Sequence, residues 1–371
     1  MKFTCNQQTL SKALNIVSKA VANKTTLPIM KGILLKVDED GYLTMSASDF
    51  YISVEKKLKV ENVIPGSVVV MSKLFGDIIR KLPNDDISFE LVDDTVEIKC
   101  QNTEFKILGL SSDEFPILNK VEGNDELIKL DKEVLSEMIK KTAFAASIDE
   151  AKGVITGVLL EIAGGKINMV ALDGYRMAIA RESIDNNNEK KIIIPAKTIN
   201  ELYKILLETS DEEYVVEMFS NEKKVIFILG EVKVVLNLLE GQFIKYSDLL
   251  PKESSLTVVL QKGDLARSIE RASLLAKEGK NNLIKFDITE NNILISSKSE
   301  EGNVKENISI YKEGDDLQIG FNSKYVLDVL KVIDDEEIKM EFNKSINPCI
   351  IKPIEGNAYE YLVLPVRITS M

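Results

Sequence analysis

The stretch TLSKALNIVSKAV, residues 9–21, sets a pattern from which the architecture of this chain can be predicted. Its apolar residues recur every three or four positions, so they fall on one face of an amphipathic helix. The same design returns in KEVLSEMIKKTAFAA at 132–146 and in GDLARSIERASLLAK at 263–277. Leucines at equivalent places in the three stretches are 125 and 130 residues apart, namely Leu10, Leu135 and Leu265.

A second set of amphipathic helices is predicted between the first three. It comprises SKLFGDIIRKLP at 72–83, KTINELYKILLE at 197–208 and SKYVLDVLKVI at 323–333. Aligned on their lysines, these stretches are 124 and 127 residues apart. The apolar face of the first is predicted to hold Leu74, Ile78, Ile79 and Leu82, and that of the third Tyr325, Val329, Leu330 and Ile333.

Each helix of the second set follows a short β-like run (SVVVM, KIIIP or LQIGF) and precedes alternating strand-like segments such as ISFELV. The chain therefore reads as an α+β protein with three copies of a unit of about 125 residues, each made of two helix-plus-strand halves. Polar, turn-rich segments at 122–126 and 251–255 predict domains at 1–124, 125–250 and 251–371. Such units can lie along an arc, helices inside and antiparallel sheets outside, so that two copies close a head-to-tail ring.

Composition excludes several functions. The 371 residues include no histidine, which removes imidazole bases and histidine metal ligands, and no glycine-rich nucleotide loop occurs. Three widely spaced cysteines suit buried thiols in a reducing cytoplasm, and no apolar segment is long enough to span a membrane or act as a signal. The net charge of −12 argues against nucleic acid unless Lys and Arg are gathered locally.

Two other interpretations stay open from the residues alone. Adjacent carboxylates could belong to an enzyme, but neighbours on a strand point to opposite faces, which favours turn positions over catalysis. These pairs are Asp85–Asp86, Asp93–Asp94, Asp315–Asp316 and Asp334–Asp335. The acidic balance alternatively suits a repeat scaffold that binds only proteins.

Several motifs, in order along the chain, resemble the bacterial sliding clamp family, the beta subunits of DNA polymerase III. They are MKFTCNQQTL, TTLPIMKGILLKV, LDGYRMAIA, GFNSKYVLDVL and the terminal YLVLPVRI, and they span residues 1 to 368. The resemblance implies a homodimeric, non-catalytic ring of the DNA-clamp fold that encircles duplex DNA without sequence preference. It implies no cofactor and no metal.

The resemblance also implies the partners and their binding site. The polymerase III alpha subunit, the clamp loader, the 3′–5′ exonuclease-containing complex, other polymerases and repair proteins would each insert a short peptide into a hydrophobic cleft between domains 2 and 3. The aliphatic walls of the cleft would accept leucine-like anchors of the peptides, and Arg176 and Arg367 would form its polar edges. Pro365 would end the hydrogen-bond ladder of the terminal strand, so that the groove stays open. The cleft residues implied by motif are Ile155, Leu172, Gly174, Tyr175, Arg176, Met177, Ile244, Leu249, Ile346, Pro348, Leu362, Leu364, Pro365, Val366 and Arg367.

Three positions depart from the family pattern. Tyr175 stands where the family has a histidine, Ile244 replaces a proline, and Asp248 reverses a charge, so the peptide preference is expected to shift. Without the resemblance, LDGYR reads as an ordinary hairpin turn and the terminal strand as plain core.

The remaining implied sites are the dimer interface and the DNA-facing surface. The interface would hold Phe105, Ile107, Leu274 and Leu275. Lys24, Lys152 and Lys197 would face DNA, together with other Lys and Arg residues of the six helices. Without the resemblance, these Lys and Arg residues are interpreted as the ordinary solvent-exposed side of each helix.

Overall fold

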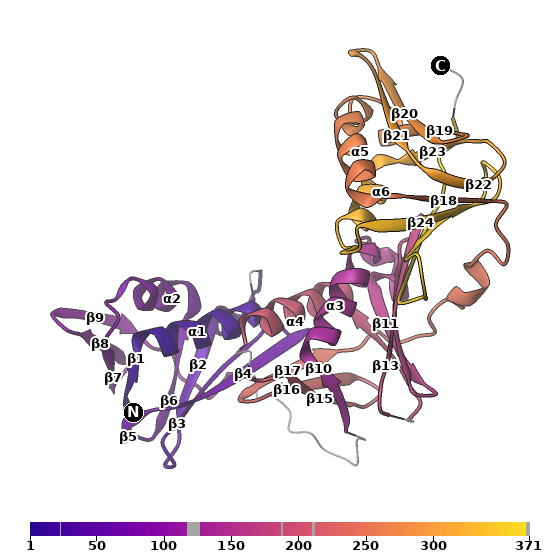
Figure 1. The fold of residues 1–371 in the computed structure, drawn as a ribbon. Coiled ribbons are helices and arrows are strands. Elements are labelled where there is room, and N and C mark those ends of the chain that lie inside the picture. The colour runs from indigo at the N-terminus through magenta and orange to yellow at the C-terminus, as the bar shows by residue number, and fades with distance from the viewer. Residues whose placement is uncertain (23, 117–126, 187, 210–211, 369–371) are drawn as a thin grey trace. The chain divides into compact units, whose positions relative to one another are not determined.

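The computed structural model describes residues 1–22, 24–116, 127–186, 188–209 and 212–368. The predicted helices are present in two sets (Figure 1). The first set is α1 (Gln7–Val17), α3 (Lys132–Thr142) and α5 (Lys262–Ala276). The second is α2 (Ser72–Lys81), α4 (Ala196–Glu208) and α6 (Ser323–Leu330). Short 3-10 turns are η1 (Ser18–Ala20), η2 (Pro28–Lys31), η3 (Ala143–Ala145), η4 (Glu150–Thr156), η5 (Tyr246–Leu249) and η6 (Lys280–Asn282).

The predicted apolar faces are mostly correct, with two differences. Ile78 and Ile79 of α2 are buried, but Leu74 is 52% exposed and Phe75 takes its place in the core. Phe75 is one position further along, which at 100° per residue turns it onto the buried face and against Phe89. In α6, Val326 is buried where Tyr325 was expected, and the helix ends before Ile333.

Among the described residues all strand pairs are antiparallel, and they form four sheets. The five-stranded sheet has the order β5 (Glu61–Ile64), β1 (Lys2–Asn6), β7 (Asp86–Val92), β8 (Thr95–Cys100), β9 (Thr103–Leu108). The four-stranded sheet has the order β21 (Gly302–Ser309), β20 (Asn292–Ser299), β19 (Leu283–Thr289), β23 (Leu317–Asn322).

The two larger sheets run across the predicted repeat boundaries. The eight-stranded sheet has the order β10 (Ile128–Asp131), β15 (Val215–Ser220), β16 (Lys224–Leu229), β17 (Val232–Asn237), β4 (Ile52–Lys59), β3 (Tyr42–Ser48), β2 (Gly32–Val37), β6 (Gly66–Met71). The nine-stranded sheet has the order β14 (Lys190–Pro195), β11 (Gly157–Ala163), β12 (Lys166–Leu172), β13 (Arg176–Ser183), β26 (Tyr359–Val363), β25 (Cys349–Lys352), β24 (Glu337–Phe342), β18 (Leu256–Gln261), β22 (Tyr311–Gly314). Strand pairing β17–β4 and β13–β26 makes each sheet continuous.

By packing, the chain forms two compact units. Unit 1 comprises Met1–Ser136 with Lys197–Leu238, and unit 2 comprises Glu137–Ala196 with Leu239–Met371. This partition follows the two continuous sheets, whereas the sequence repeat divides the chain into three. Within unit 1, Phe3 stacks on Phe89 with ring centroids 4.7 Å apart, and both side chains are fully buried. Among the described residues no helix is long and apolar enough to cross a membrane.

Candidate functional site: an apolar cleft at the C-terminal tail

The C-terminal tail leaves one sheet and joins another, and Pro365 lies at the change. Strand β26 pairs with β13 on one side and β25 on the other. Beyond it the Leu364 amide donates to the Tyr175 carbonyl at 2.9 Å, and the Val366 amide donates to the Gly320 carbonyl of β23 at 2.8 Å. Proline has no N–H, so it fits the one residue between these bonds that needs no partner. The tail thereby bridges the nine-stranded and four-stranded sheets of unit 2.

Gly320 lets the tail come this close. A Cβ atom at Gly320 would lie 2.8 Å from the Val366 carbonyl oxygen and 2.9 Å from Leu283 Cδ1. Real Cβ atoms are not found at such distances, so a larger residue would displace the tail. The glycine thus fixes the path of the tail.

An open cleft of about 710 Å³ lies beside the tail and is called the tail cleft below. Four predicted cleft residues line it, namely Ile346, Pro365, Val366 and Arg367. Four further lining residues were not predicted, namely Gln318, Gly320, Ser345 and Ile368. A glycine inside an apolar strand is itself a signal of close backbone approach, and Gly320 could have been found that way. Ile346 is 78% exposed, which leaves an apolar anchor available at the rim.

A second group of predicted residues forms buried core next to the tail instead of an open wall. Leu172, Met177 and Leu362 are each at most 6% exposed and belong to one cluster with Leu159 and Ile350. The cause is that β13 pairs with β26, which brings Met177 opposite Leu362 inside the nine-stranded sheet. Partly buried side chains that pack on this cluster are Val154, Ile155, Leu239, Phe243, Tyr246, Leu250 and Leu364.

Four other predicted residues lie outside the regular helices and strands, and of these Ile155 packs on this cluster. Ile155 lies in the 3-10 turn η4. Ile244 and Leu249 are 42% and 45% exposed on the segment that includes η5. Pro348, half-buried, precedes β25. Asp248, the charge reversal, forms an ion pair with Lys245 at 3.1 Å, so its charge is compensated locally.

The LDGYRM turn is held by Asp173. Its Oδ1 accepts hydrogen bonds from the Tyr175 amide at 2.8 Å and the Arg176 amide at 3.0 Å, while Gly174 takes a φ of 95° that suits glycine. The turn therefore presents Tyr175 outward, 55% exposed.

Arg176 does not supply the polar edge that was expected of it. Its side chain is only 9% exposed, because it pairs with Asp173 at 3.1 Å and with Asp328 of α6 at 2.7 Å. It also donates to the Phe144 carbonyl at 3.0 Å. The guanidinium makes its hydrogen bonds within the protein, and these bonds connect the turn to α6. Arg367 is the exposed cation of the tail cleft.

Tyr175 is part of an aromatic stack. Its ring lies 5.9 Å from that of Tyr325, at an interplanar angle of 19°. The Lys152 ammonium is 5.6 Å from the Tyr175 centroid and donates to the Asp173 carbonyl at 3.1 Å. Burial first, and then the charge of Asp173, raise the pKa of Tyr325. Lys152, implied as a DNA-facing residue, is thus also a contact of this turn.

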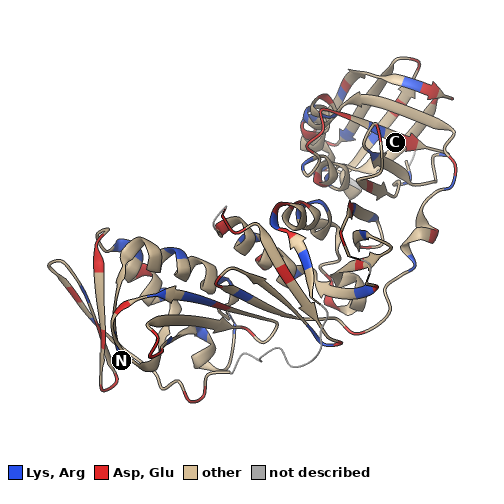
Figure 2. Cartoon of the chain, turned by 60° about the horizontal axis from the view of Figure 1, so that its bottom comes forward, with Lys and Arg blue, Asp and Glu red and all other residues tan. Residues whose placement is uncertain are grey.

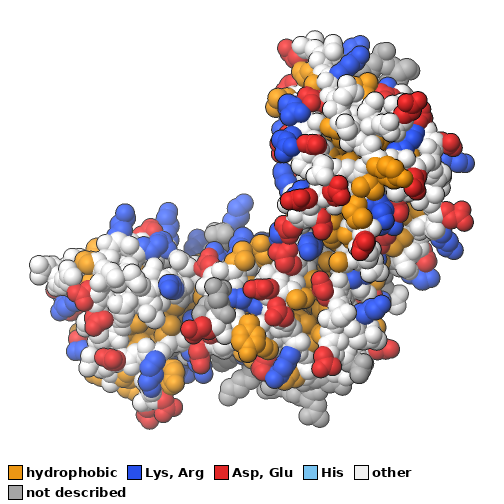
Figure 3. Space-filling model, viewed as in Figure 1, with side chains coloured by type: hydrophobic (Ala, Val, Ile, Leu, Met, Phe, Trp, Pro, Cys, Tyr) orange, Lys and Arg blue, Asp and Glu red, His pale blue; other side chains and the backbone are white. Residues whose placement is uncertain are grey.

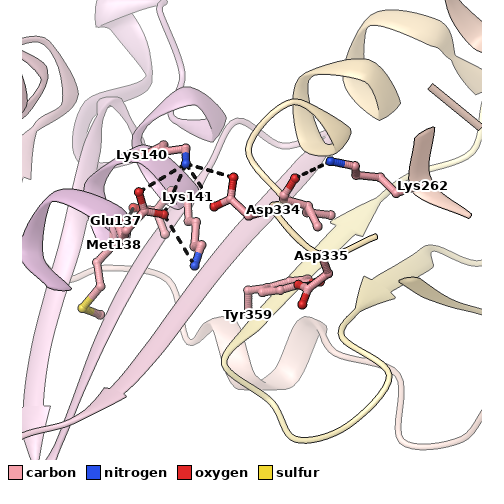
Figure 4. A network of polar contacts seen from close by, with 10 residues as sticks. Glu137, Met138, Lys140, Lys141, Lys262, Asp334, Asp335 and Tyr359 are labelled. Carbon is pink, nitrogen blue, oxygen red and sulfur yellow. Dashed lines mark hydrogen bonds and ion pairs between the residues drawn. The ribbon is translucent and has the colours of Figure 1, made fainter. Parts of the chain in front are cut away.

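A polar network in unit 2 anchors the start of the terminal strand (Figure 4). Lys140 of α3 lies between Glu137 at 3.2 Å and Asp334 at 3.1 Å. Lys262 donates to the Ile333 carbonyl at 2.8 Å, and the Tyr359 hydroxyl donates to Asp335 at 2.6 Å. The loop after α6 is therefore tied to α3, α5 and β26, so one of the adjacent carboxylate pairs serves structure.

The other carboxylates have similar structural roles. Asp85 accepts from Gln101 at 2.9 Å, Asp93 lies in a turn with φ of 52°, and Asp316 pairs with Lys312. Within the described ranges no group of three or more Cys, Asp or Glu side chains could hold a metal ion.

The predicted dimer residues lie at sheet and helix surfaces of each unit. In unit 1, Phe105 is 38% exposed and Ile107 half-buried on β9, the edge strand of the five-stranded sheet. In unit 2, Leu274 is 67% exposed and Leu275 half-buried on α5. Leu108, 69% exposed on β9, was not predicted. Figure 3 shows such apolar side chains as separate patches among charged ones.

Lys or Arg occurs on each of the helices α1 to α6, and Asp or Glu occurs on each of them except α1 (Figure 2). Seven of the predicted helix cations form ion pairs, namely Lys19, Arg80, Lys140, Lys141, Lys204, Arg267 and Arg271. Five form none with a described residue, namely Lys12, Lys73, Lys197, Lys324 and Lys331. Lys197 and Lys24 are both exposed.

Comparison with known proteins places the chain in a family along its whole length. Residues 1–119, 129–245 and 247–367 match the N-terminal, central and C-terminal domains of the DNA polymerase III beta subunit. The beta sliding clamp of Staphylococcus epidermidis is 35% identical over 379 aligned residues, covering 99% of each chain.

Solved structures agree with the sequence comparison. The DNA polymerase sliding clamp from Bacillus subtilis has 32% identity and a TM-score of 0.93 over 100% of both chains. The sliding clamp from Pseudomonas aeruginosa bound to griselimycin has 25% identity and a TM-score of 0.94, covering 99% of this chain and 100% of that one. The chain therefore belongs to the DNA polymerase III beta subunit family, the bacterial sliding clamps.

Proposed function

We propose that this chain is a DNA sliding clamp. Two copies form a ring around duplex DNA and hold the polymerase III alpha subunit and other DNA-processing proteins at the template. They do so through a hydrophobic peptide-binding cleft between domains 2 and 3, to which domain 3 contributes the tail cleft. The clamp has no catalytic activity of its own. The observation that carries this function is the family match over three consecutive domains together with an open cleft beside residues 365–368.

The sheet edges support closure by a second copy. The five-stranded sheet ends at β9, and the four-stranded sheet ends at β21. Pairing of these edges between two copies would give a sheet of nine strands, the size of the continuous sheet β14 to β22. Exposed Phe105 and Leu274 would supply apolar contacts at that interface. We take the three domains as 1–124, 125–250 and 251–371.

Weak phosphate contacts suit a ring that slides. A topological link needs no strong attraction, which makes the net charge of −12 compatible with DNA. Lys24, Lys197 and the helix lysines without ion pairs are the proposed DNA-facing groups, since their ammonium groups need not break a bond to meet phosphate. We also place the protein in the cytoplasm, which suits three buried cysteines outside any disulfide.

The first test is the solution mass. Light scattering should give about twice 41.5 kDa, and Phe105→Arg with Leu274→Arg should shift the mass toward one chain. The second test is topological. Clamp loaded on nicked circular DNA by a clamp loader with ATP should be lost after the DNA is linearised. Retention on linear DNA, or a monomer at micromolar concentration, would favour a protein-binding scaffold instead.

The tail cleft has its own test. Griselimycin, which the Pseudomonas aeruginosa clamp binds, should bind this chain as well. Ile346→Arg should weaken griselimycin binding at least tenfold, because the substitution puts a charge at the apolar rim. Leu207→Arg is the matched control. It places the same charge at an exposed leucine of α4 and should leave binding unchanged. Equal loss in both variants would place the ligand elsewhere.

A further inference from the structure

A groove in unit 1 has no role in the function proposed above. It measures about 430 Å³ and is lined by Leu27, Pro28, Ile29, Leu110, Ser111, Asp113 and Glu114. We call it the repeat-1 groove. Leu27 is 49% exposed and the side chains of Ile29 and Leu110 are partly buried, so apolar surface is open to solvent. Its volume lies in the range of small ligand and peptide sites.

Both walls of the groove are held by backbone hydrogen bonds. The 3-10 turn η2 is closed by Met30, whose amide donates to the Leu27 carbonyl at 3.1 Å and whose carbonyl accepts from Ala22 at 3.1 Å. On the other side Leu110 exchanges two bonds with Val69 of β6, at 3.0 and 2.9 Å. The groove is therefore preformed, and binding would not need to order its walls.

The internal repeat shows that this wall is built a second time beside the tail. Leu110 donates to the Val69 carbonyl as Leu239 donates to the Ile193 carbonyl, in both cases at 2.9 Å. Ile29 precedes Gly32 by three residues, as Val154 precedes Gly157. Both glycines are in close contact with the neighbouring strand, where a Cβ would meet a side chain at 2.4 or 2.7 Å.

The two copies differ in what packs on them. In the second repeat Val154 and Leu239 pack on the cluster that contains Leu362 of the terminal strand. No residue of that strand lines the repeat-1 groove. The first copy therefore keeps an open apolar surface where the second is partly covered by the chain's own end.

The rim of the repeat-1 groove is acidic. Asp113 and Glu114 are both exposed, and neither forms an ion pair with a described residue. Asp113 accepts a hydrogen bond from the Ser111 hydroxyl at 2.9 Å, which keeps its carboxylate at the rim. Among the described residues that line the groove there is no Lys or Arg. Two carboxylates beside an apolar groove favour a ligand that is apolar in the middle and positively charged at its flank.

We propose that the repeat-1 groove is a second peptide-binding site, which takes a short partner segment with an aliphatic or aromatic anchor flanked by Lys or Arg. The described lining of the tail cleft includes Arg367 and no Asp or Glu, so the tail cleft favours a different sequence. The two sites lie in different packing units and can be occupied by different segments. This inference goes beyond the clamp function, because it uses neither DNA nor the tail.

The test starts from random peptides displayed on phage and selected on the wild-type full-length chain. Selected peptides are then measured by fluorescence anisotropy on wild type, Leu27→Arg, Asp113→Lys with Glu114→Lys, and Ile346→Arg. We expect one class rich in Lys or Arg around an apolar residue. This class should lose at least about tenfold affinity with the first two variants and none with Ile346→Arg, and its affinity should fall as salt rises.

Other outcomes would overturn the proposal. If every selected peptide is lost with Ile346→Arg and kept with Leu27→Arg, the tail cleft is the only peptide site. If no peptide class depends on Asp113 and Glu114, the charge argument is wrong. Leu27→Ala serves as the milder variant, with the melting temperature and solution mass showing that each protein is folded. Loss of dimer mass or DNA loading in wild type would contradict the clamp function and leave this result unaffected.

Discussion

The tail cleft and the repeat-1 groove have similar apolar walls but opposite charge at the rim. Arg367 lies in the lining of the first, and Asp113 and Glu114 lie in that of the second. Apolar contact supplies most of the affinity of such a site for a short peptide, whereas charge selects among peptides of equal apolarity. One repeated architecture can thereby serve two sequence preferences.

The two sites also differ in how their walls are held. The wall of the repeat-1 groove is an internal segment fixed by the exchange of two bonds between Leu110 and Val69. The wall of the tail cleft is the segment after β26, and Val366 reaches the second sheet through one backbone bond to Gly320. A single substitution should therefore disturb the tail cleft and leave the repeat-1 groove intact.

Gly320→Ala should have the largest effect. Its Cβ would lie 2.8 Å from the Val366 carbonyl, so the tail must move, at a cost of about 1–3 kcal/mol in the free energy of unfolding. Griselimycin binding should be lost, while basic peptides in the repeat-1 groove stay bound. Chemical denaturation measures the free energy of unfolding, and fluorescence anisotropy measures the binding of griselimycin and of the basic peptides. Gly263→Ala is the control, because its Cβ would meet only the flexible end of Arg267. Equal destabilisation by the two variants would contradict the role given to Gly320.

Tyr175→Ala should have the next effect, confined to unit 2. It removes the stack on Tyr325 and the contact with Lys152, for a loss of about 0.5–1.5 kcal/mol in the free energy of unfolding. Tyr51→Ala is the control, since that tyrosine is 61% exposed. A Tyr175 variant as stable as the control would mean that the stack contributes nothing.

Arg367→Glu should sharpen the charge comparison. Acidic peptides that bind the tail cleft should weaken several-fold, as is usual for an exposed rim charge, and basic peptides in the repeat-1 groove should be unaffected. Affinity is measured by anisotropy at low and high salt. If acidic and basic peptides respond alike, rim charge does not select between the sites.

The smallest effect is expected at Asp334. The hydrogen bond from Lys140 lowers the pKa of Asp334 below its ordinary value of 3.8. A lowered folded pKa contributes stability that is present above that value and is lost as pH falls below it. Because the carboxylate is 67% exposed, Asp334→Asn should cost less than about 1 kcal/mol at pH 7, and this cost should fall as the pH is lowered below 3.8.

The pH dependence of the Asp334 variant is the informative part. Melting temperatures of wild type and variant should converge as the pH is lowered from 7 to 3. Asp248→Asn, which removes an exposed charge paired with Lys245, is the matched control. A difference that stays constant with pH would exclude the ion pair to Lys140 as its cause.

The sequence predicted the helices and most strands because apolar periodicity is a local property. The six predicted helices are present, since each has an apolar face at helical spacing. Leu74 and Phe75 show the limit of the method. Both are large and apolar, and only packing against Phe89 decides which of them is buried.

The site was predicted in part, through residues close together in the sequence. Ile346 and the tail residues Pro365, Val366 and Arg367 do line one cleft. Gln318, Ser345 and Ile368 were missed, because no local pattern separates a cleft-lining residue from any other surface residue. Arg176 was assigned to the rim, but it is held inside by Asp328, a residue 152 positions away.

The sequence by itself determined the threefold repeat, the family and the terminal apolar strand, because all three are encoded in the order and spacing of residues. Only the tertiary structure decided that the sheets continue from one repeat into the next and that the tail crosses from Tyr175 to Gly320. It alone decided that one copy of the repeated wall stays open. Pairing between distant strands depends on edge geometry and packing, which no local stretch of sequence specifies.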